Sequence, residues 1–346
     1  MKQLGLRRFV LLMLLTACVF WCVVVALPHD KYLRYQSLND HVAPNAYWIY
    51  QRIHRDETPI DVAFVGSSRT GRSVNTARLQ RDLAERGFDV HAVNFHVVKT
   101  GRDMHYVIAK ELLTHRKVKL LVVEMTELED RKSHPDFIFL ADPIDVIRAP
   151  ILINLNYFSD LARLPGRQTD LFLETRMEGL GLRKPDFVPP AYQGPNLDWT
   201  EYLDTLDGKR YPLTTQHSRE QMEELRHKQE ASITPAVLPQ SFENLEFQVP
   251  RHYIASILAL AKEQGTKVVF LYTPRYSGPA TPPPYERLYS SVPMMNPEPL
   301  LREHHIWADA THVNWEGSKI LTDFVADELQ RGGYFSHGPS EVSGSL

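Results

Sequence analysis

A run of nineteen uncharged, mostly apolar residues near the start of the chain constrains its architecture more than any other feature. The run reads FVLLMLLTACVFWCVVVAL, from Phe9 to Leu27. As a helix it would extend about 28 Å, which matches the hydrocarbon core of a bilayer. No second apolar run of comparable length follows it. We therefore expect the chain to cross a membrane once.

The flanking charges predict the direction of that crossing. Three basic residues precede the run: Lys2, Arg7 and Arg8. Because basic residues stay on the cytoplasmic side, we expect a cytoplasmic tail over 1–8, an anchor over 9–27 and a periplasmic body at a bacterial inner membrane. The alternative is a cleaved secretory signal, since Val24-Val25-Ala26 offers a small-residue cleavage site. The run exceeds the usual signal core of about 7–15 residues, which favours the anchor.

Composition narrows the class of protein further. The chain has 346 residues, enough for a large domain with a full core, and a formal net charge of -3. It lacks the basic field with which nucleic-acid-binding proteins collect phosphates, so we expect no nucleic-acid partner. Its two cysteines, Cys18 and Cys22, both lie in the apolar run, so the body cannot form a disulfide.

An alternation of short apolar runs and amphipathic segments predicts an α/β fold with a parallel sheet. The expected strands are 61–66, 90–95, 119–125 and 267–273, and the expected helices are 75–86, 103–114, 252–263 and 314–330. The alternation stops between about 129 and 249, which we interpret as a long, mainly helical insertion in a domain spanning 58–331. Residues 28–57 lack clean periodicity and indicate a stem near the membrane, and residues 332–346 indicate a flexible tail.

Ser68 is the first residue to which the pattern assigns chemistry. It follows the predicted strand DVAFVG in the sequence Gly66-Ser67-Ser68-Arg69. A serine just past the carboxyl end of a buried parallel strand lies where open α/β sheets place reactive groups. Backbone N–H groups of the following turn could stabilise an oxyanion there. The alternative is a simple turn or a helix cap, in which serine is also common.

Asp309 and His312 form the second candidate, in a loop just before the last predicted helix. An aspartate three residues before a histidine can reach the imidazole and fix its tautomer for use as a base. The alternative is that Asp309 is a turn residue and His312 a partly buried aromatic residue. Together with Ser68, the pair would supply a nucleophile, a base and a group that orients the base.

With both segments, the chain resembles the SGNH (GDSL-like) hydrolase superfamily over about 60–329. The serine stands where that family has its Gly-Asp-Ser block, and Asp309 to His312 where it has its Asp-x-x-His block. The resemblance implies an SGNH-like (flavodoxin-like) three-layer fold. It also implies that Ser68 is the nucleophile, His312 the general base and acid, and Asp309 its orienting partner.

The family's second and third blocks match less closely. Asn94 and Gly101 resemble the second block, which implies that the Ser68 amide and Gly101 donate to the oxyanion. The third block of the family reads Gly-x-Asn-Asp, whereas residues 123–130 here read VEMTELED. Losing an oxyanion donor can cost about 2.7–4 kcal/mol of transition-state stabilisation, so this departure weakens a plain hydrolase assignment.

The anchor, the Gly-Ser-Ser-Arg variant and the unusual third block resemble a membrane-tethered branch of this superfamily. That branch includes the D-alanyl transfer proteins of teichoic acids and the alginate O-acetylation proteins. The resemblance implies an O-acyltransferase that modifies an envelope polysaccharide or glycolipid beside a multi-span membrane-bound O-acyltransferase. Two alternatives stay open: a periplasmic esterase that removes such groups, and an idle scaffold of an acylation complex.

Other motifs add no further chemistry. Arg69 and Arg72 could hold an anionic group of a substrate, although pairing or solvation is the more usual role of such arginines. The fifteen histidines show no metal-ligand spacing, so we expect no metal. The chain contains no Gly-x-Gly-x-x-Gly or phosphate-binding loop, and we expect no cofactor.

Overall fold

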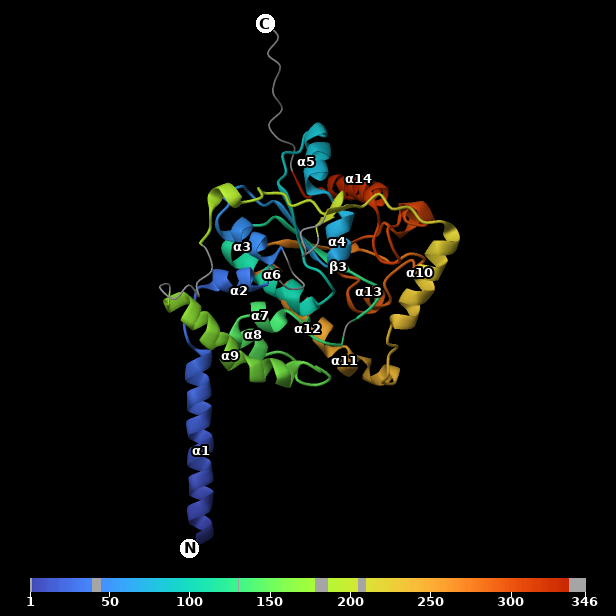
Figure 1. Ribbon diagram of the computed structural model, residues 1–346. Helices are drawn as coiled ribbons and strands as arrows, with labels where there is room; N and C mark the ends of the chain where they lie inside the picture. Colours follow the sequence, from blue (N-terminus) through green and yellow to red (C-terminus); the bar gives the residue numbers. More distant parts are fainter. Residues whose placement is uncertain (1, 39–44, 130, 178–185, 205–209, 336–346) are drawn as a thin grey trace.

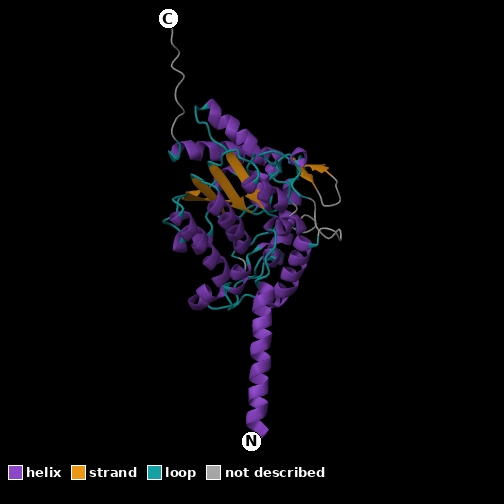
Figure 2. Cartoon of the chain, turned by 90° about the vertical axis from the view of Figure 1, so that its left-hand side faces the viewer, coloured by secondary structure: helices purple, strands orange, loops and turns teal. Residues whose placement is uncertain are grey.

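The computed structural model describes residues 2–38, 45–129, 131–177, 186–204 and 210–335. Its centre is a five-stranded sheet in the order β2-β1-β3-β6-β7, in which every pairing is parallel. Figure 2 shows these strands together inside a shell of helices. The strands are β1 (Val62–Gly66), β2 (Ala92–His96), β3 (Leu120–Met125), β6 (Lys267–Tyr272) and β7 (Met294–Met295). The predicted α/β fold with a parallel sheet is confirmed, and its strand order is that of flavodoxin-like folds.

Alternate residues of each central strand point into two separate cores. In β1, Ala63 and Val65 join one hydrophobic cluster, whereas Val62 and Phe64 join another. Strands buried on both faces read as continuous apolar runs, which is why they could be recognised in the sequence. The sheet is therefore the middle of three layers.

Helices from distant parts of the chain cover the two faces. One face carries α3 (Ala46–His54), α6 (Arg102–His115) and α12 (Gln248–Glu263). The other carries α5 (Thr76–Glu85) and α14 (Trp315–Arg331), which pack against each other. Parallel strands need such crossover helices between them.

An apolar helix, α1 (Lys2–Val25), projects from the body in Figure 1. Within the described residues it is the one helix long and apolar enough to cross a membrane, over Gly5–Val25. Its length and composition fit either a membrane anchor or a signal sequence.

Residues 28–57 are the stretch for which the sequence indicated a stem near the membrane. They form α2 (Lys31–Ser37) and α3, although residues 39–44 lie outside the described part of the chain. Tyr35, Trp48 and Ile49 are almost fully buried in the larger core. Helices this short contain too few turns to give a clear apolar period, which explains why the sequence did not indicate them.

The region between β3 and α12 is mainly helical, as expected. Its elements are α7 (Phe137–Leu140), α8 (Pro143–Ile147), α9 (Tyr157–Arg176), β4 (Tyr202–Asp204), β5 (Arg210–Pro212), α10 (Arg219–Ser232) and α11 (Glu243–Glu246). Phe137 and Leu164 extend the larger core. One further helix, α13 (Pro283–Leu288), lies between β6 and β7. Of the predicted tail, only residues 332–335 belong to the described chain.

Candidate active site

Ser68 lies at the carboxyl end of β1, where the sheet order reverses. It is the first residue of α4 (Ser68–Ser73), a short helix that Ser67 caps by accepting a hydrogen bond from the Arg69 amide. The next two strands of the chain, β2 and β3, lie on opposite sides of β1, so the direction in which strands are added changes here. Crevices at such switch points are where open α/β sheets bind ligands. Ser68 is half-buried there.

The loop before α14 brings His312 to this serine. His312 Nε2 lies 2.9 Å from Ser68 Oγ, although the two residues are 244 positions apart. An antiparallel bridge between Trp307 and Val313 closes the loop, and the Asn314 side chain caps α14. Both ends of the loop are therefore fixed, which holds the imidazole over the end of β1.

Asp309 completes the arrangement on the other side of the imidazole. Its Oδ2 and Oδ1 atoms lie 2.9 and 3.0 Å from His312 Nδ1. The carboxylate also accepts hydrogen bonds from the His312 amide and from the amide and hydroxyl of Thr311. The structure thus joins the three residues predicted from the sequence in a Ser-His-Asp chain of hydrogen bonds.

The surroundings favour a charged Asp309 and a neutral His312. Burial would raise the pKa of the Asp309 carboxyl, but hydrogen bonds from His312 and Thr311 outweigh it and hold that pKa well below its usual value. Burial lowers the pKa of His312; Asp309 opposes this shift, whereas Arg72 and Arg69 add to it. A neutral imidazole is the form that can accept a proton from Ser68.

Gly101 occupies the N-cap position of α6, and the structure explains why a glycine stands there. A Cβ atom at this position would lie 2.6 Å from the Cβ of His134 and 2.8 Å from Oδ1 of Asp103. Asn94, the other second-block residue, uses its side-chain amide to hold the backbone of Thr70 and Val74. These roles are structural, and oxyanion binding by Gly101 stays a prediction.

Sequence reasoning missed the part played by Glu124, a buried carboxylate directly behind the serines. It accepts hydrogen bonds from the amide and hydroxyl of Ser67 and from the hydroxyl of Thr70. Burial opposes its charge, but His105 and Arg102 with these hydrogen bonds hold its pKa below the usual value. A glutamate inside the apolar strand LLVVEM was the available signal, because a buried charge requires partners.

The two arginines after Ser68 are paired. Arg69 is 8% exposed and makes a two-pronged ion pair with Glu127, with Nη1 2.9 Å from Oε2. Arg72 Nη1 lies 3.6 Å from Asp309 Oδ2. Both arginines are therefore in ion pairs, which the sequence analysis gave as their more usual role. Glu127 belongs to the segment 123–130 that departs from the family pattern, and its role here is to pair with Arg69.

A cleft of about 510 Å³ borders the site through Arg69, the residue after Ser68. Most of the residues that line it are polar, and some of them come from the end of α10. The polar lining residues are Arg69, Thr100, Thr126, Glu129, Arg131, Lys132, Gln229, Ser232 and Thr234. Hydroxyls, amides and ammonium groups of this kind can hydrogen-bond to a hydroxyl-rich ligand.

One group of side chains has the composition of a metal site. His54, Glu111 and His115 hold their possible ligand atoms within 4.8 Å of one another. The ammonium of Lys31 pairs with the same Glu111 carboxylate, and His54 Nε2 lies 2.8 Å from Glu111 Oε1. A metal ion would have to displace that ammonium. The cluster is therefore best described as an ion-pair network that joins α2, α3 and α6.

The geometry at the end of β1 can therefore support nucleophilic acyl chemistry. Ser68 supplies a hydroxyl, His312 a neutral base, and Asp309 a charge that orients and stabilises the imidazole. No known family model matches the chain, and no curated protein matches it either.

Proposed function

We propose that this protein is an extracytoplasmic O-acyltransferase of SGNH type, anchored in a bacterial inner membrane. It would pass an acyl group through Ser68 to an envelope polysaccharide or glycolipid, beside a membrane-bound O-acyltransferase. The observation that carries the proposal is the hydrogen-bonded chain from Ser68 through His312 to Asp309.

In the first half-reaction, Ser68 Oγ attacks the carbonyl carbon of an acyl donor. His312 Nε2 takes the serine proton and passes it to the departing group of the donor, whose bond to the acyl carbon breaks. Asp309 stays charged and stabilises the imidazolium. The product is an acyl ester on Ser68. The Ser68 amide is the nearest candidate donor to the oxyanion, since the first amides of a helix lack intrahelical partners.

In the second half-reaction, His312 removes a proton from a sugar hydroxyl. The sugar oxygen attacks the acyl carbon, the bond to Ser68 Oγ breaks, and the serine recovers its proton from the imidazolium. Water in place of the sugar would make the same site an esterase. The polar cleft beside Arg69 supports a hydroxyl-bearing acceptor, because it offers several hydrogen-bonding groups close to the site.

The attachment of α1 to the body supports the anchor over a cleaved signal. Val25, the last residue of α1, is 7% exposed within the larger core. The buried Gln168 side chain donates to the carbonyl oxygen of Val25 at 3.1 Å. Cleavage after Ala26 would remove that core residue and leave the buried amide without this partner, which is costly.

The test is the ester content of envelope glycans from cells that make the wild-type protein, Ser68→Ala, or none. We expect Ser68→Ala and the deletion to lose the same esters while a blot shows normal protein levels. Ser256→Ala is the matched control, because this serine on α12 donates to the His252 carbonyl oxygen of its own helix. A rise in esters would indicate the esterase, and wild-type content in Ser68→Ala would contradict serine chemistry.

A fluorophosphonate probe separates an enzyme from an idle scaffold. The probe reacts with a serine whose proton a neighbouring base removes. We expect labelling of the wild-type protein and of Ser256→Ala, and none of Ser68→Ala. Absence of labelling in the folded wild-type protein would favour the scaffold.

A further inference from the structure

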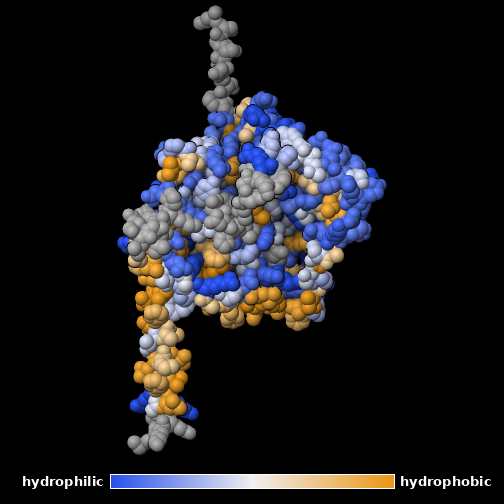
Figure 3. Space-filling view, viewed as in Figure 1, coloured by the Kyte–Doolittle hydropathy of each residue, from blue (hydrophilic) through white to orange (hydrophobic). Residues whose placement is uncertain are grey.

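An apolar surface, here named the ledge, lies on the side of the body from which α1 emerges. Its large side chains are strongly exposed: Ile144 at 45%, Ile151 at 53%, Leu152 at 59%, Leu155 at 73% and Phe158 at 71%. They come from α8, from the start of α9 and from the loop between them. Figure 3 shows hydrophobic surface along the lower side of the body, beside the apolar helix. Soluble proteins rarely expose so many large apolar side chains together.

The conformation of the loop between α8 and α9 directs these side chains outward. Ile153 adopts φ 53°, a strained conformation for a β-branched residue. The buried Asn154 side chain accepts hydrogen bonds from Ser133 Oγ and from the Asn156 amide, at 3.3 and 3.2 Å. Asn156 in turn donates to the Ser133 carbonyl oxygen at 3.1 Å. A polar inner side therefore fixes a loop whose outer side is apolar.

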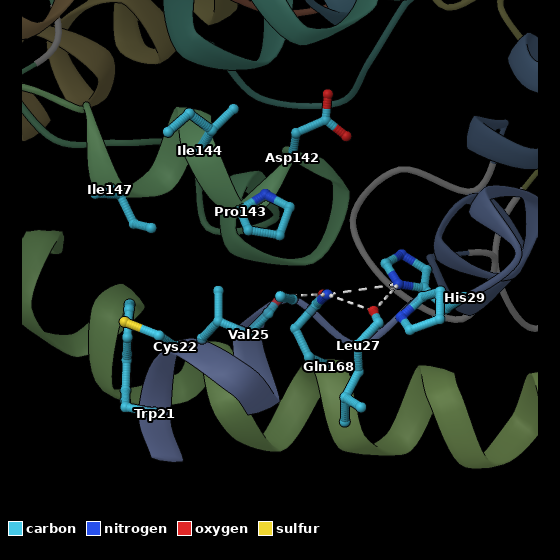
Figure 4. Close-up of a pocket in the computed structure, with 12 residues that line it drawn as sticks. Trp21, Cys22, Val25, Leu27, His29, Asp142, Pro143, Ile144, Ile147 and Gln168 are labelled. Atoms are coloured by element: carbon cyan, nitrogen blue, oxygen red, sulfur yellow. Dashed lines mark hydrogen bonds between the residues drawn. The ribbon is translucent and has the colours of Figure 1, made fainter. Parts of the chain in front are cut away.

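The end of α1 determines the depth at which the ledge would meet a membrane that α1 spans. Its last turns, with Trp21, Cys22 and Val25, lie across a pocket of about 580 Å³ from Ile144 and Ile147 of α8 (Figure 4). Tryptophan is enriched where the hydrocarbon core meets the headgroups. If α1 spans the bilayer, Ile144 therefore lies at the outer interface. α9 packs against both α1 and α8, so its first turn belongs to the same rigid unit.

We propose that the ledge inserts into the outer leaflet of the lipid bilayer, so that the body rests on the membrane. Lipid chains would also fill the pocket between α1 and α8. Amphipathic surfaces of this kind bury their apolar face in the boundary between headgroups and acyl chains. Arg148 and Arg163 are exposed on the same elements, where they can meet lipid phosphates. The inference rests on the proposed anchor and not on the chemistry of Ser68.

The ledge would also orient the candidate site. Leu155 lines the polar cleft and belongs to the ledge, and Arg69, which directly follows Ser68 in the chain, lines the same cleft. One end of the cleft would thus open near the lipid surface. A donor or acceptor held at the membrane could enter there.

The test places a fluorescent probe on single cysteines in the full chain, in nanodiscs of phosphatidylcholine and phosphatidylglycerol. Cys18 and Cys22 are first replaced by alanine, and cysteine is then introduced as Leu155→Cys, Phe158→Cys or Ala84→Cys. Ala84 is the matched control, because it is exposed on α5, away from the exit of α1 (Figure 1). We expect iodide quenching at the two ledge positions to be roughly threefold weaker than at Ala84, since interfacial burial reaches about 5–10 Å. Nitroxides on the lipids should quench the ledge probes more strongly.

Two results would overturn the inference. One is iodide quenching at Leu155→Cys and Phe158→Cys equal to that at Ala84→Cys, in protein that stays in the membrane after an alkaline wash. The other is protection that occurs in native membranes but not in pure lipid, which would indicate a protein partner. Adding Ser68→Ala should leave the quenching unchanged, so failure of the acyl chemistry and failure of membrane insertion are distinguishable.

Discussion

Ser67 and Ser68 are adjacent, yet the structure places them in opposite surroundings. Ser67 is 1% exposed, donates to Glu124 and accepts from the Arg69 amide, so all its hydrogen bonds lie inside the protein. Ser68 is half-buried, and its hydroxyl meets the imidazole of His312. The hydroxyl of the first serine stabilises the turn, whereas the hydroxyl of the second faces the imidazole.

The same division applies to the carboxylates around the two serines. Glu124 is occupied by Ser67 and Thr70, and Glu127 by Arg69. Asp309 is the carboxylate that faces His312. A buried network thus fixes the backbone under the site, and the outer three residues keep the protonation states that acyl transfer requires. Substitutions in the two layers should have different effects.

The largest expected effect separates the two serines. Ser68→Ala should lower acyl transfer by about 10⁴-fold or more, because the attacking oxygen is lost. Its unfolding temperature should stay near that of the wild type.

Ser67→Ala should instead cost about 1–3 kcal/mol of unfolding free energy, since it leaves the buried Glu124 short of a donor. Probe-labelling rates and thermal unfolding check both, and equal loss of activity without destabilisation in both variants would contradict the division.

Asp309→Asn should have the next largest effect. The amide cannot stabilise an imidazolium and favours the wrong tautomer of His312, so we expect a fall of about 10⁴-fold in the labelling rate of Ser68. Thr311→Val is the control, because it removes one hydrogen bond to Asp309 but keeps the carboxylate. A labelling rate for Asp309→Asn similar to that of Thr311→Val would show that the charge is not needed.

Some elements of the fold were much harder to predict from sequence than the central strands. The strands β1 and β3 were found because apolar side chains fill both of their faces. The two-residue strand β7 leaves no such pattern, since its place depends on hydrogen bonds to β6. The helices α2 and α3 were missed because their aromatic residues contact distant parts of the chain.

The outer layer was predictable for a different reason. Periodicity says nothing about residues 244 positions apart, and only the resemblance to a known pattern joined Ser68 to His312. The partners of Glu124 could not be inferred in that way, because the chain departs from the pattern there. A glutamate in an apolar strand indicates that its buried carboxylate must accept hydrogen bonds, but which residues donate them depends on the fold.

A smaller effect is expected from Glu124→Gln. The new side chain keeps the shape but directs an NH₂ group toward the hydroxyl or amide donors of Ser67 and Thr70. We expect a loss of about 3 kcal/mol in unfolding free energy, the cost of unsatisfied buried groups. Glu224→Gln on the exposed side of α10 is the control and should leave stability unchanged. Unfolding in urea measures both, and equal midpoints would contradict a structural role for Glu124.

The smallest effect concerns pH, through Arg72. Burial, with Arg72 and Arg69, holds the pKa of His312 below its usual value, so activity should fall on the acid side only below about pH 6.5. Arg72→Gln removes a positive charge that disfavours the imidazolium. The pKa of His312 should therefore rise, and the loss of activity on the acid side of the pH profile should begin at a higher pH. Arg78→Gln is the control, because Arg78 pairs with Asp323 away from the site. Probe-labelling rates measured against pH give this part of the profile directly. A shift to lower pH in Arg72→Gln would show that Arg72 acts mainly by holding the Asp309 carboxylate charged and in place beside His312.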